Sequence, residues 1–338
     1  MQKDHTDFKQ DPLKDLNQLP QWALTCGINH HSPSQGQLIN AVWLAKYIMM
    51  NQEERRQQPV NAQMKAGVAV NNALQNYYAE IIYRINPLTK KISETKNEKV
   101  RTDKQVLIYE EINKFKDYIP NDEKDQAKKD RYSDEILDVC NQAFSALEEI
   151  GVASFSVTSE RQISINQDRS MLQIPVVGRT DFELSTQTDV IFPSGLIELK
   201  TSWSKIGKVK KDGSRSFIVS TAPATPSFNH LMQCAFYSAA YDFKTPIVLL
   251  YATKNDYKIF DSKNCEALTT AGLQTNYNKM LQILKRREKI LSMSDGASKE
   301  EIIKNAVQLI EPNWDHPYLW HGFNEDILER ARGYWNNA

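Results

Sequence analysis

Apolar side chains recur at helical spacing along two blocks of the chain, before residue 151 and after about residue 261. In the first block, helices are predicted from about residue 34 and over about 64–84, 105–118 and 133–150. Gly151 follows the last of these and is typical of a helix C-terminus. From Leu273 the chain is again predicted to be helical, and Ser298 and Glu301 form a capping box that opens a helix running to Ile310.

Between these blocks, the pattern changes to an alternation of apolar and polar residues, which indicates strands. Strands are predicted as a pair within 154–165, and at 174–184, 188–192, 196–200 and 247–253. A helix over about 226–241 connects the last two, 86–104 suits an exposed loop or hairpin, and 202–221 suits a polar, lysine-rich loop. This order predicts an α/β fold with a mixed central sheet, flanked by N- and C-terminal helical elaborations.

The composition of the 338 residues is that of an ordinary globular protein. The 42 basic and 42 acidic residues cancel, so affinity for nucleic acid can come only from local clusters of charge. No stretch approaches the roughly 20 apolar residues of a membrane span, and the polar N-terminus is unlike a targeting peptide. The four cysteines lack C-x-x-C spacing, which argues against a zinc ribbon or an iron–sulfur cluster and favours free thiols in the cytoplasm.

The segment GRTDFELSTQTDVIFPSGLIELKTS carries the strongest chemical signal. Asp181 ends one predicted strand, and Glu198 and Lys200 project to the same face of a later strand because side chains alternate there. If the two strands are neighbours, the two carboxylates converge and offer the oxygen ligands that Mg²⁺ or Mn²⁺ prefers. Lys200 could then orient a water molecule or neutralise charge in the transition state. The alternative is an ordinary solvated salt bridge between Glu198 and Lys200, worth under about 1 kcal/mol.

A second signal lies on the predicted helix HLMQCAFYSAAY. Gln233 and Tyr237 stand four residues apart and therefore share one face of the helix, with His230 on the same side. A polar stripe within an otherwise apolar helix suits a site. The alternative is a buried amphipathic helix without chemical function.

The series GRTD, IELKT and Q-x-x-x-Y, which ends on the predicted helix, resembles the motif series of RecB-type exonucleases in the PD-(D/E)XK nuclease superfamily. That group includes phage exonucleases and the mitochondrial genome maintenance exonuclease. The resemblance covers about residues 150–255. It implies that Asp181, Glu198 and the Leu199 backbone carbonyl bind Mg²⁺ or Mn²⁺, and that Lys200 is the catalytic lysine. It further implies that Gln233 positions the lysine or the attacking water, and that Tyr237 lies against the substrate backbone.

An upstream helix gives a looser similarity. Members of the group often carry R-G-T-x-x-H-x-x-x-E, in which the histidine and the glutamate complete the metal site. Here Asn71 and Gln75 stand at the corresponding positions as possible accessory residues, and amide oxygens are weaker ligands. Either the site holds one metal or these are not the matching positions. The iron–sulfur cysteines of some relatives are absent from the sequence.

Basic residues follow the Glu198–Lys200 strand directly. The residues predicted to contact DNA here are Ser202, Lys205, Lys208, Lys210 and Lys211, as a clamp on phosphates. A solvated loop is the alternative. Near the C-terminus, Trp314, His316, Trp320 and His321 form an aromatic cluster for which core packing is favoured over base stacking or metal binding.

The predicted function is that of a metal-dependent DNA nuclease, an exonuclease that prefers single-stranded ends. The predicted organisation is an irregular arm (1–30), a helical region roofing the site (31–150), the nuclease core (151–260) and a helical region packed on the core (261–338). The alternatives are a non-catalytic nucleic-acid-binding protein on the same fold, supported by Asn71 and Gln75, and a structure-specific endonuclease. Protein partners are not predicted.

Overall fold

The chain folds into two compact units, each assembled from separate segments. The computed structural model describes residues 19–85, 92–186, 194–209, 215–316, 319–320 and 323–337. One unit comprises Met1–Pro59, Ile163–Gly178 and Gln274–Ala338, and the other comprises Val60–Gln162 and Arg179–Leu273. The second unit contains every described residue of the predicted site, and we call it the sheet unit.

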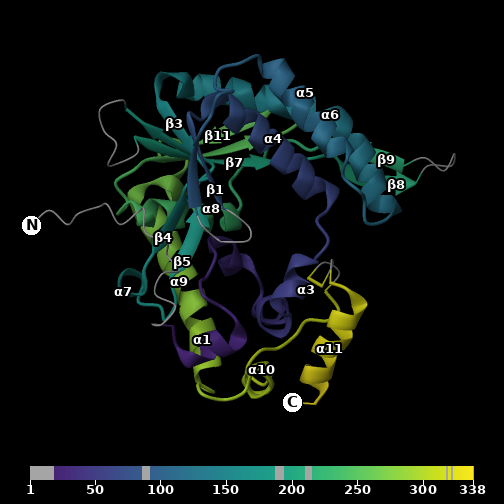
Figure 1. Ribbon diagram of the computed structural model, residues 1–338, viewed down its shortest axis with the longest axis vertical. Coiled ribbons are helices and arrows are strands. Elements are labelled where there is room, and N and C mark those ends of the chain that lie inside the picture. Colours follow the sequence, from purple (N-terminus) through teal and green to yellow (C-terminus); the bar gives the residue numbers. More distant parts are fainter. Residues whose placement is uncertain are drawn as a thin grey trace, which may run out of the picture. The chain divides into compact units, whose positions relative to one another are not determined.

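A seven-stranded mixed sheet forms the centre of the sheet unit (Figure 1). Its strands, in spatial order, are β11 (Tyr257–Phe260), β10 (Ile247–Ala252), β7 (Gly195–Thr201), β6 (Phe182–Ser185), β3 (Ser156–Ser159), β1 (Ile81–Ile85) and β2 (Ile92–Lys96). The β7–β10 and β1–β3 pairs are parallel, and the other four are antiparallel. The predicted α/β class with a mixed central sheet is confirmed.

Helices cover the sheet, and one of them connects two of its parallel strands. The helices of this unit are α4 (Ala62–Tyr78), α5 (Lys104–Lys116), α6 (Glu123–Ile150) and α8 (Phe228–Ala240). Residues of α4, α5 and α6 share one hydrophobic core with one face of the sheet (Figure 1). Helix α8 is the predicted crossover between the parallel strands β7 and β10. Gly151 ends α6 with a φ of 78°, a left-handed conformation that glycine adopts without strain.

The end of one predicted helix, and part of a predicted loop or hairpin, form strands of the sheet. The helix predicted over 64–84 ends at Tyr78, and Ile81–Ile85 forms strand β1. The β-branched pair Ile81–Ile82 favours a strand, and pairing with both β2 and β3 outweighs the helical spacing of the apolar residues. Within 86–104, where a loop or hairpin was predicted, Ile92–Lys96 forms strand β2, which pairs with β1 from before that range.

The predicted strand pair within 154–165 is also different in the structure. Strands β3 and β4 (Gln162–Ile165) do not pair with each other, and Glu160 between them has a left-handed backbone with φ of 55°. Strand β4 pairs with β5 (Val176–Arg179) in a separate two-stranded sheet. The strand predicted at 188–192 lies outside the described residues.

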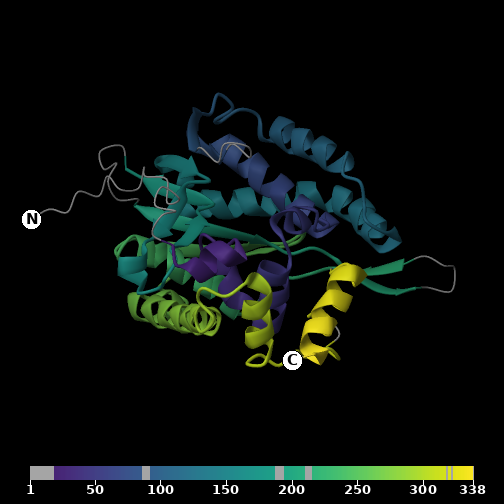
Figure 2. The ribbon, with the colours of Figure 1, turned by 60° about the horizontal axis from the view of Figure 1, so that its bottom comes forward.

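The lysine-rich segment 202–221 contains a hairpin and is not simply a loop. Strands β8 (Lys205–Val209) and β9 (Arg215–Ile218) pair antiparallel. Figure 2 shows this hairpin extending beyond the end of α6. The guanidinium of Arg131 on α6 lies 5.5 Å from the ring centre of Phe217, which anchors the hairpin to the helix.

The other unit is mainly helical. Its helices are α1 (Gln21–Cys26), η3 (Pro33–Gln37), α2 (Asn40–Trp43), η4 (Leu44–Met49), α3 (Gln52–Arg56), α7 (Gln167–Ser170), most of α9 (Thr270–Ser292), α10 (Lys299–Val307) and α11 (Glu325–Asn336). The helix predicted from residue 34 is broken into 3₁₀, α and π pieces. Buried Arg287 donates to the carbonyls of Gln35 and Leu38 there, which satisfies backbone oxygens that a regular helix would use internally.

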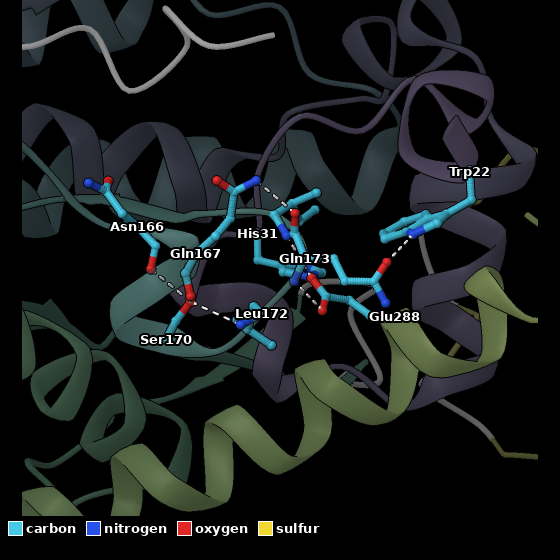
Figure 3. Close-up of polar contacts among 9 residues, drawn as sticks. Trp22, His31, Asn166, Gln167, Ser170, Leu172, Gln173 and Glu288 are labelled. Carbon is cyan, nitrogen blue, oxygen red and sulfur yellow. Dashed lines mark hydrogen bonds and ion pairs between the residues drawn. The ribbon is translucent and has the colours of Figure 1, made fainter. Parts of the chain in front are cut away.

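A buried cluster of polar side chains joins distant segments of this helical unit (Figure 3). Glu288 on α9 accepts hydrogen bonds from the backbone N–H groups of Gln173 and Ile174 at 2.7 and 3.0 Å, and lies 3.0 Å from His31 Nε2. Trp22 Nε1 donates to Gln173 Oε1 at 2.6 Å. These contacts satisfy buried polar groups and are explained by the packing of the unit, while His31 Nδ1 is buried without a partner.

Several further sequence predictions can be compared with the structure. The capping box of Ser298 and Glu301 is present at the start of α10. Trp314 and Trp320 stack with ring centres 4.3 Å apart and pack in the helical unit's core, as predicted. Core packing was wrong for His316, which is exposed, and His321 lies outside the described residues. All four cysteines are free thiols. Among the described helices, none combines the length and apolar character needed to cross a membrane.

Candidate active site

Asp181 and Glu198 face each other across neighbouring strands. The antiparallel pairing of Phe182 with Ile197 places Asp181, which directly precedes β6, opposite Glu198 on β7. The backbone N–H of Leu199 donates to Asp181 Oδ2 at 2.8 Å and so holds this carboxylate at the end of the ladder. The predicted convergence of the two carboxylates is therefore present, although Asp181 begins a strand and does not end one.

Lys200 shares the face of Glu198, as strand alternation predicted. Lys200 Nζ lies 2.5 Å from Glu198 Oε1, while Leu199 belongs to the core on the opposite face of the sheet. Side-chain exposure is 3% for Glu198 and 22% for Lys200. An ion pair this buried is not the solvated surface pair that was the alternative explanation, and removing one member would leave an uncompensated buried charge.

The three charges are unbalanced in a buried setting. Burial, followed by repulsion from Glu198, raises the pKa of Asp181 well above its ordinary value. Burial alone would lower the pKa of Lys200, but attraction to Glu198 and Asp181 outweighs it and raises that pKa. When both carboxylates ionise, one ammonium group leaves a net negative charge, which favours a bound cation.

The atoms around these charges fit a divalent cation. Glu198 Oε2 and Asn71 Oδ1 are buried and have no hydrogen-bond partner. A hollow of about 570 Å³ is lined by Asn71, Asp181, Leu199 and Lys200, among other residues. Among the described residues, no three His, Cys, Asp or Glu side chains form a metal site by themselves. A cation here would therefore need Asp181 and Glu198 together with neutral oxygens, which hard cations such as Mg²⁺ and Mn²⁺ accept.

The two accessory candidates on α4 have different surroundings. Asn71 lines the hollow, and its oxygen is available. Gln75 instead donates from Nε2 to Glu160 Oε1 at 3.1 Å and to the backbone oxygen of Asp181 at 3.5 Å. Asn71 is thus placed to contribute an oxygen, whereas Gln75 supports the backbone of Asp181.

Glu160 is a site residue that the sequence patterns did not indicate. It accepts from Gln75 and lies 3.4 Å from Arg179 Nη1, and its charge also contributes to the raised pKa of Asp181. It stood inside an apparent pair of strands, where a charged residue needs no special explanation. The polar run Ser159–Gln162, which interrupts the alternation, was the only available sign.

Helix α8 brings Tyr237 and His230 of the predicted face near the charged groups, together with Cys234. Cys234 and Tyr237 are buried, and Glu198 and Asp181 help to raise the pKa of each after burial itself. Burial and then Lys200 lower the pKa of His230 to about 4, and its Nδ1 lies 2.7 Å from the hydroxyl of Tyr251.

The polar pair predicted on α8 is thus split by the packing. Gln233 is partly exposed and does not line the hollow. Tyr237 is only 6% exposed, and the charges of Glu198 and Asp181 both act on its hydroxyl group. The roles implied for these two side chains stay predictions. The resemblance had implied positioning by Gln233 and substrate contact by Tyr237.

The predicted phosphate clamp is described only in part. Lys205 and Lys208 are exposed on β8, and Ser202 is partly buried just before that strand. Lys210 and Lys211 lie outside the described residues. The exposed lysines belong to the hairpin that follows the Lys200 strand, so they provide positive charge that water can reach.

Replacing Asp181 by asparagine should stabilise the metal-free protein at neutral pH. Because folding raises the pKa of Asp181, its contribution to stability is full below the ordinary carboxyl pKa and is lost as pH rises through the raised pKa. Asparagine keeps an acceptor for the Leu199 N–H but cannot ionise. We expect a higher thermal midpoint for Asp181→Asn than for wild type at pH 7.5 without metal, with the difference shrinking as pH falls. A lower midpoint at pH 7.5 would contradict this account of the charges.

Comparison with family models, with curated proteins and with solved structures finds no match to this chain.

Proposed function

We propose that this protein is a metal-dependent DNA nuclease with a PD-(D/E)XK-type active site, and that it acts as an exonuclease on single-stranded ends. One observation carries the proposal. The carboxylates of Asp181 and buried Glu198 stand in register beside the partly buried Lys200, and Glu198 Oε2 and the oxygen of neighbouring Asn71 have no hydrogen-bond partner. A packed core has no structural need for this arrangement, because burying unbalanced charge costs stability.

The residues have separate roles in this proposal. Asp181, Glu198 and the Leu199 carbonyl would hold Mg²⁺ or Mn²⁺, with Asn71 as a further oxygen. The cation supplies Lewis acidity and positive charge for phosphodiester hydrolysis. Lys200, whose raised pKa keeps it charged, would orient the attacking water or stabilise negative charge on the phosphate.

The direct test is incubation of the full chain with end-labelled linear single-stranded DNA. We expect cleavage with Mg²⁺ or Mn²⁺, none with a chelator, and loss of cleavage in Asp181→Asn. If the wild-type protein binds the strand but leaves it intact with either metal, the non-catalytic binding protein is the correct function. RNA of the same sequence, tested in parallel, decides the class of nucleic acid.

We further predict that cleavage requires a free end. Helix α4 forms one wall of the hollow beside Lys200, and a hollow walled by a helix would admit a flexible strand more easily than a duplex about 20 Å wide. Covalently closed single-stranded circles offer the same phosphates without an end. Circles should resist digestion under conditions that degrade linear strands of the same sequence. Similar rates on both would show an endonuclease, and the helices would then serve stability or a protein partner.

A further inference from the structure

The face of α4 beside the site carries apolar side chains that the fold leaves uncovered. Met64 and Val68 are 57% and 53% exposed, and they stand one helical turn apart. Both line the hollow that also contains Asp181 and Lys200. Because these two side chains are not buried in the core, core packing does not explain their position beside the charged residues.

The approach of α4 to β7 places these side chains next to the catalytic strand. A Cβ atom at Gly67 would lie only 3.2 Å from Oγ1 of Thr201, so glycine permits the close contact between helix and strand. Gly67 lies between Met64 and Val68 in the sequence, and Thr201 directly follows Lys200. The apolar pair is thus held at the C-terminal end of β7.

The rest of the hollow includes an aromatic ring held in place and an exposed amide group. Trp203, 4% exposed, is held by a hydrogen bond from its Nε1 to Thr201 Oγ1 at 3.1 Å, and its ring centre lies 5.1 Å from that of Tyr132. Gln63 is exposed at the rim and adds an amide group. The volume of about 570 Å³ is within the range of small-molecule sites.

We infer that this hollow binds the nucleoside of the nucleotide whose phosphate lies at Lys200, with the unpaired base against Met64 and Val68. This inference rests on the proposed nuclease function. A nucleobase has apolar faces and hydrogen-bonding edges, which match an apolar wall bordered by an amide. The ammonium of Lys200 at the same hollow suits the attached phosphate. A base must leave the duplex to enter such a site, so the hollow selects single strands.

Mononucleotide binding tests the inference without relying on cleavage. The probes are deoxyadenosine 5′-monophosphate, deoxyadenosine 3′-monophosphate and deoxyribose 5-phosphate, titrated calorimetrically into the full chain with Mn²⁺. We expect at least one nucleotide to bind about ten-fold or more tightly than the sugar phosphate, because contact with the base adds affinity.

Val68→Ser should remove most of that difference. Val106→Ser is the matched control, because Val106 is 54% exposed on α5 of the same unit and does not line the hollow. The control variant should retain the difference in full.

Three outcomes would overturn the inference: equal binding of nucleotide and sugar phosphate, absence of nucleotide binding, or equal losses in the two valine variants. The linear-strand assay on the same preparation separates these from failure of the proposed function. If metal-dependent cleavage persists while the base makes no contribution, only the base site is wrong. If cleavage is absent as well, the nuclease proposal fails.

Discussion

Replacing Asp181 by asparagine should lower the rate of DNA cleavage by at least about 100- to 1000-fold. A bound metal contributes several kcal/mol to stabilising the transition state of a hydrolysis, and about 1.4 kcal/mol corresponds to a ten-fold change in rate. Asp181 accepts the Leu199 N–H and directly faces Glu198, so its loss would remove a central ligand without disturbing the β6–β7 pairing. The measurement is cleavage of linear single strands across a range of Mg²⁺ concentrations.

Glu198→Gln should be equally inactive but should behave differently in stability. It leaves Lys200 without the partner that lies 2.5 Å from its ammonium, so this variant should melt at a lower temperature than Asp181→Asn. DNA binding should survive in Asp181→Asn, because that substitution removes negative charge. Asp138→Asn, which neutralises a partly exposed carboxylate on α6, is the control and should cleave normally. Cleavage by Asp181→Asn at near the wild-type rate would show that the site has been assigned incorrectly.

Replacing Lys200 by methionine should lower kcat by about 100- to 1000-fold, the size of effect seen when one preorganised charge-stabilising group is removed. Methionine keeps an unbranched side chain of similar length but carries no charge. The ammonium contacts Glu198 and lines the hollow beside Asp181, so its effect should fall on the reaction step and leave KM nearly unchanged. Single-turnover kinetics with saturating enzyme isolates that step.

The exposed hairpin lysines provide the comparison for Lys200. Lys205 and Lys208 are exposed and do not line the hollow, so replacing both by methionine should raise KM and weaken its salt dependence while kcat stays near wild type. Equal losses of kcat in Lys200→Met and in the double variant would refute this division of roles. Thermal melts of both variants must show folded protein for the comparison to count.

The sequence predicted the arrangement of Asp181, Glu198 and Lys200 more fully than the rest of the candidate site. Alternation along residues 196–200 fixes which side chains share a face, and that rule needs no tertiary information. The opposition of Asp181 and Glu198 required only that β6 and β7 be neighbours. The helix carrying Gln233 and Tyr237 was also predicted, but helical spacing alone did not show that Cys234 would be buried beside Tyr237 near the carboxylates.

Other features depend on contacts between distant segments. Glu160 lies near the site through its contact with Gln75 on a distant helix, which no periodic pattern reveals. Residues 81–85 have helical spacing of apolar side chains, and only pairing with β2 and β3 makes them a strand. The division into two units likewise follows from long-range contacts such as that of His31 with Glu288, whose positions are far apart in the sequence.

Locating Mn²⁺ in crystals of the full chain tests most directly whether the centre is a metal site. Anomalous diffraction from crystals grown with Mn²⁺ identifies the ion independently of any activity. We expect a peak coordinated by carboxylate oxygens of Asp181 and Glu198 and by the Leu199 carbonyl, at distances between about 2.0 and 2.6 Å, and its loss in Asp181→Asn crystals. Wild-type crystals with no peak between Asp181 and Glu198 at saturating Mn²⁺ would contradict it.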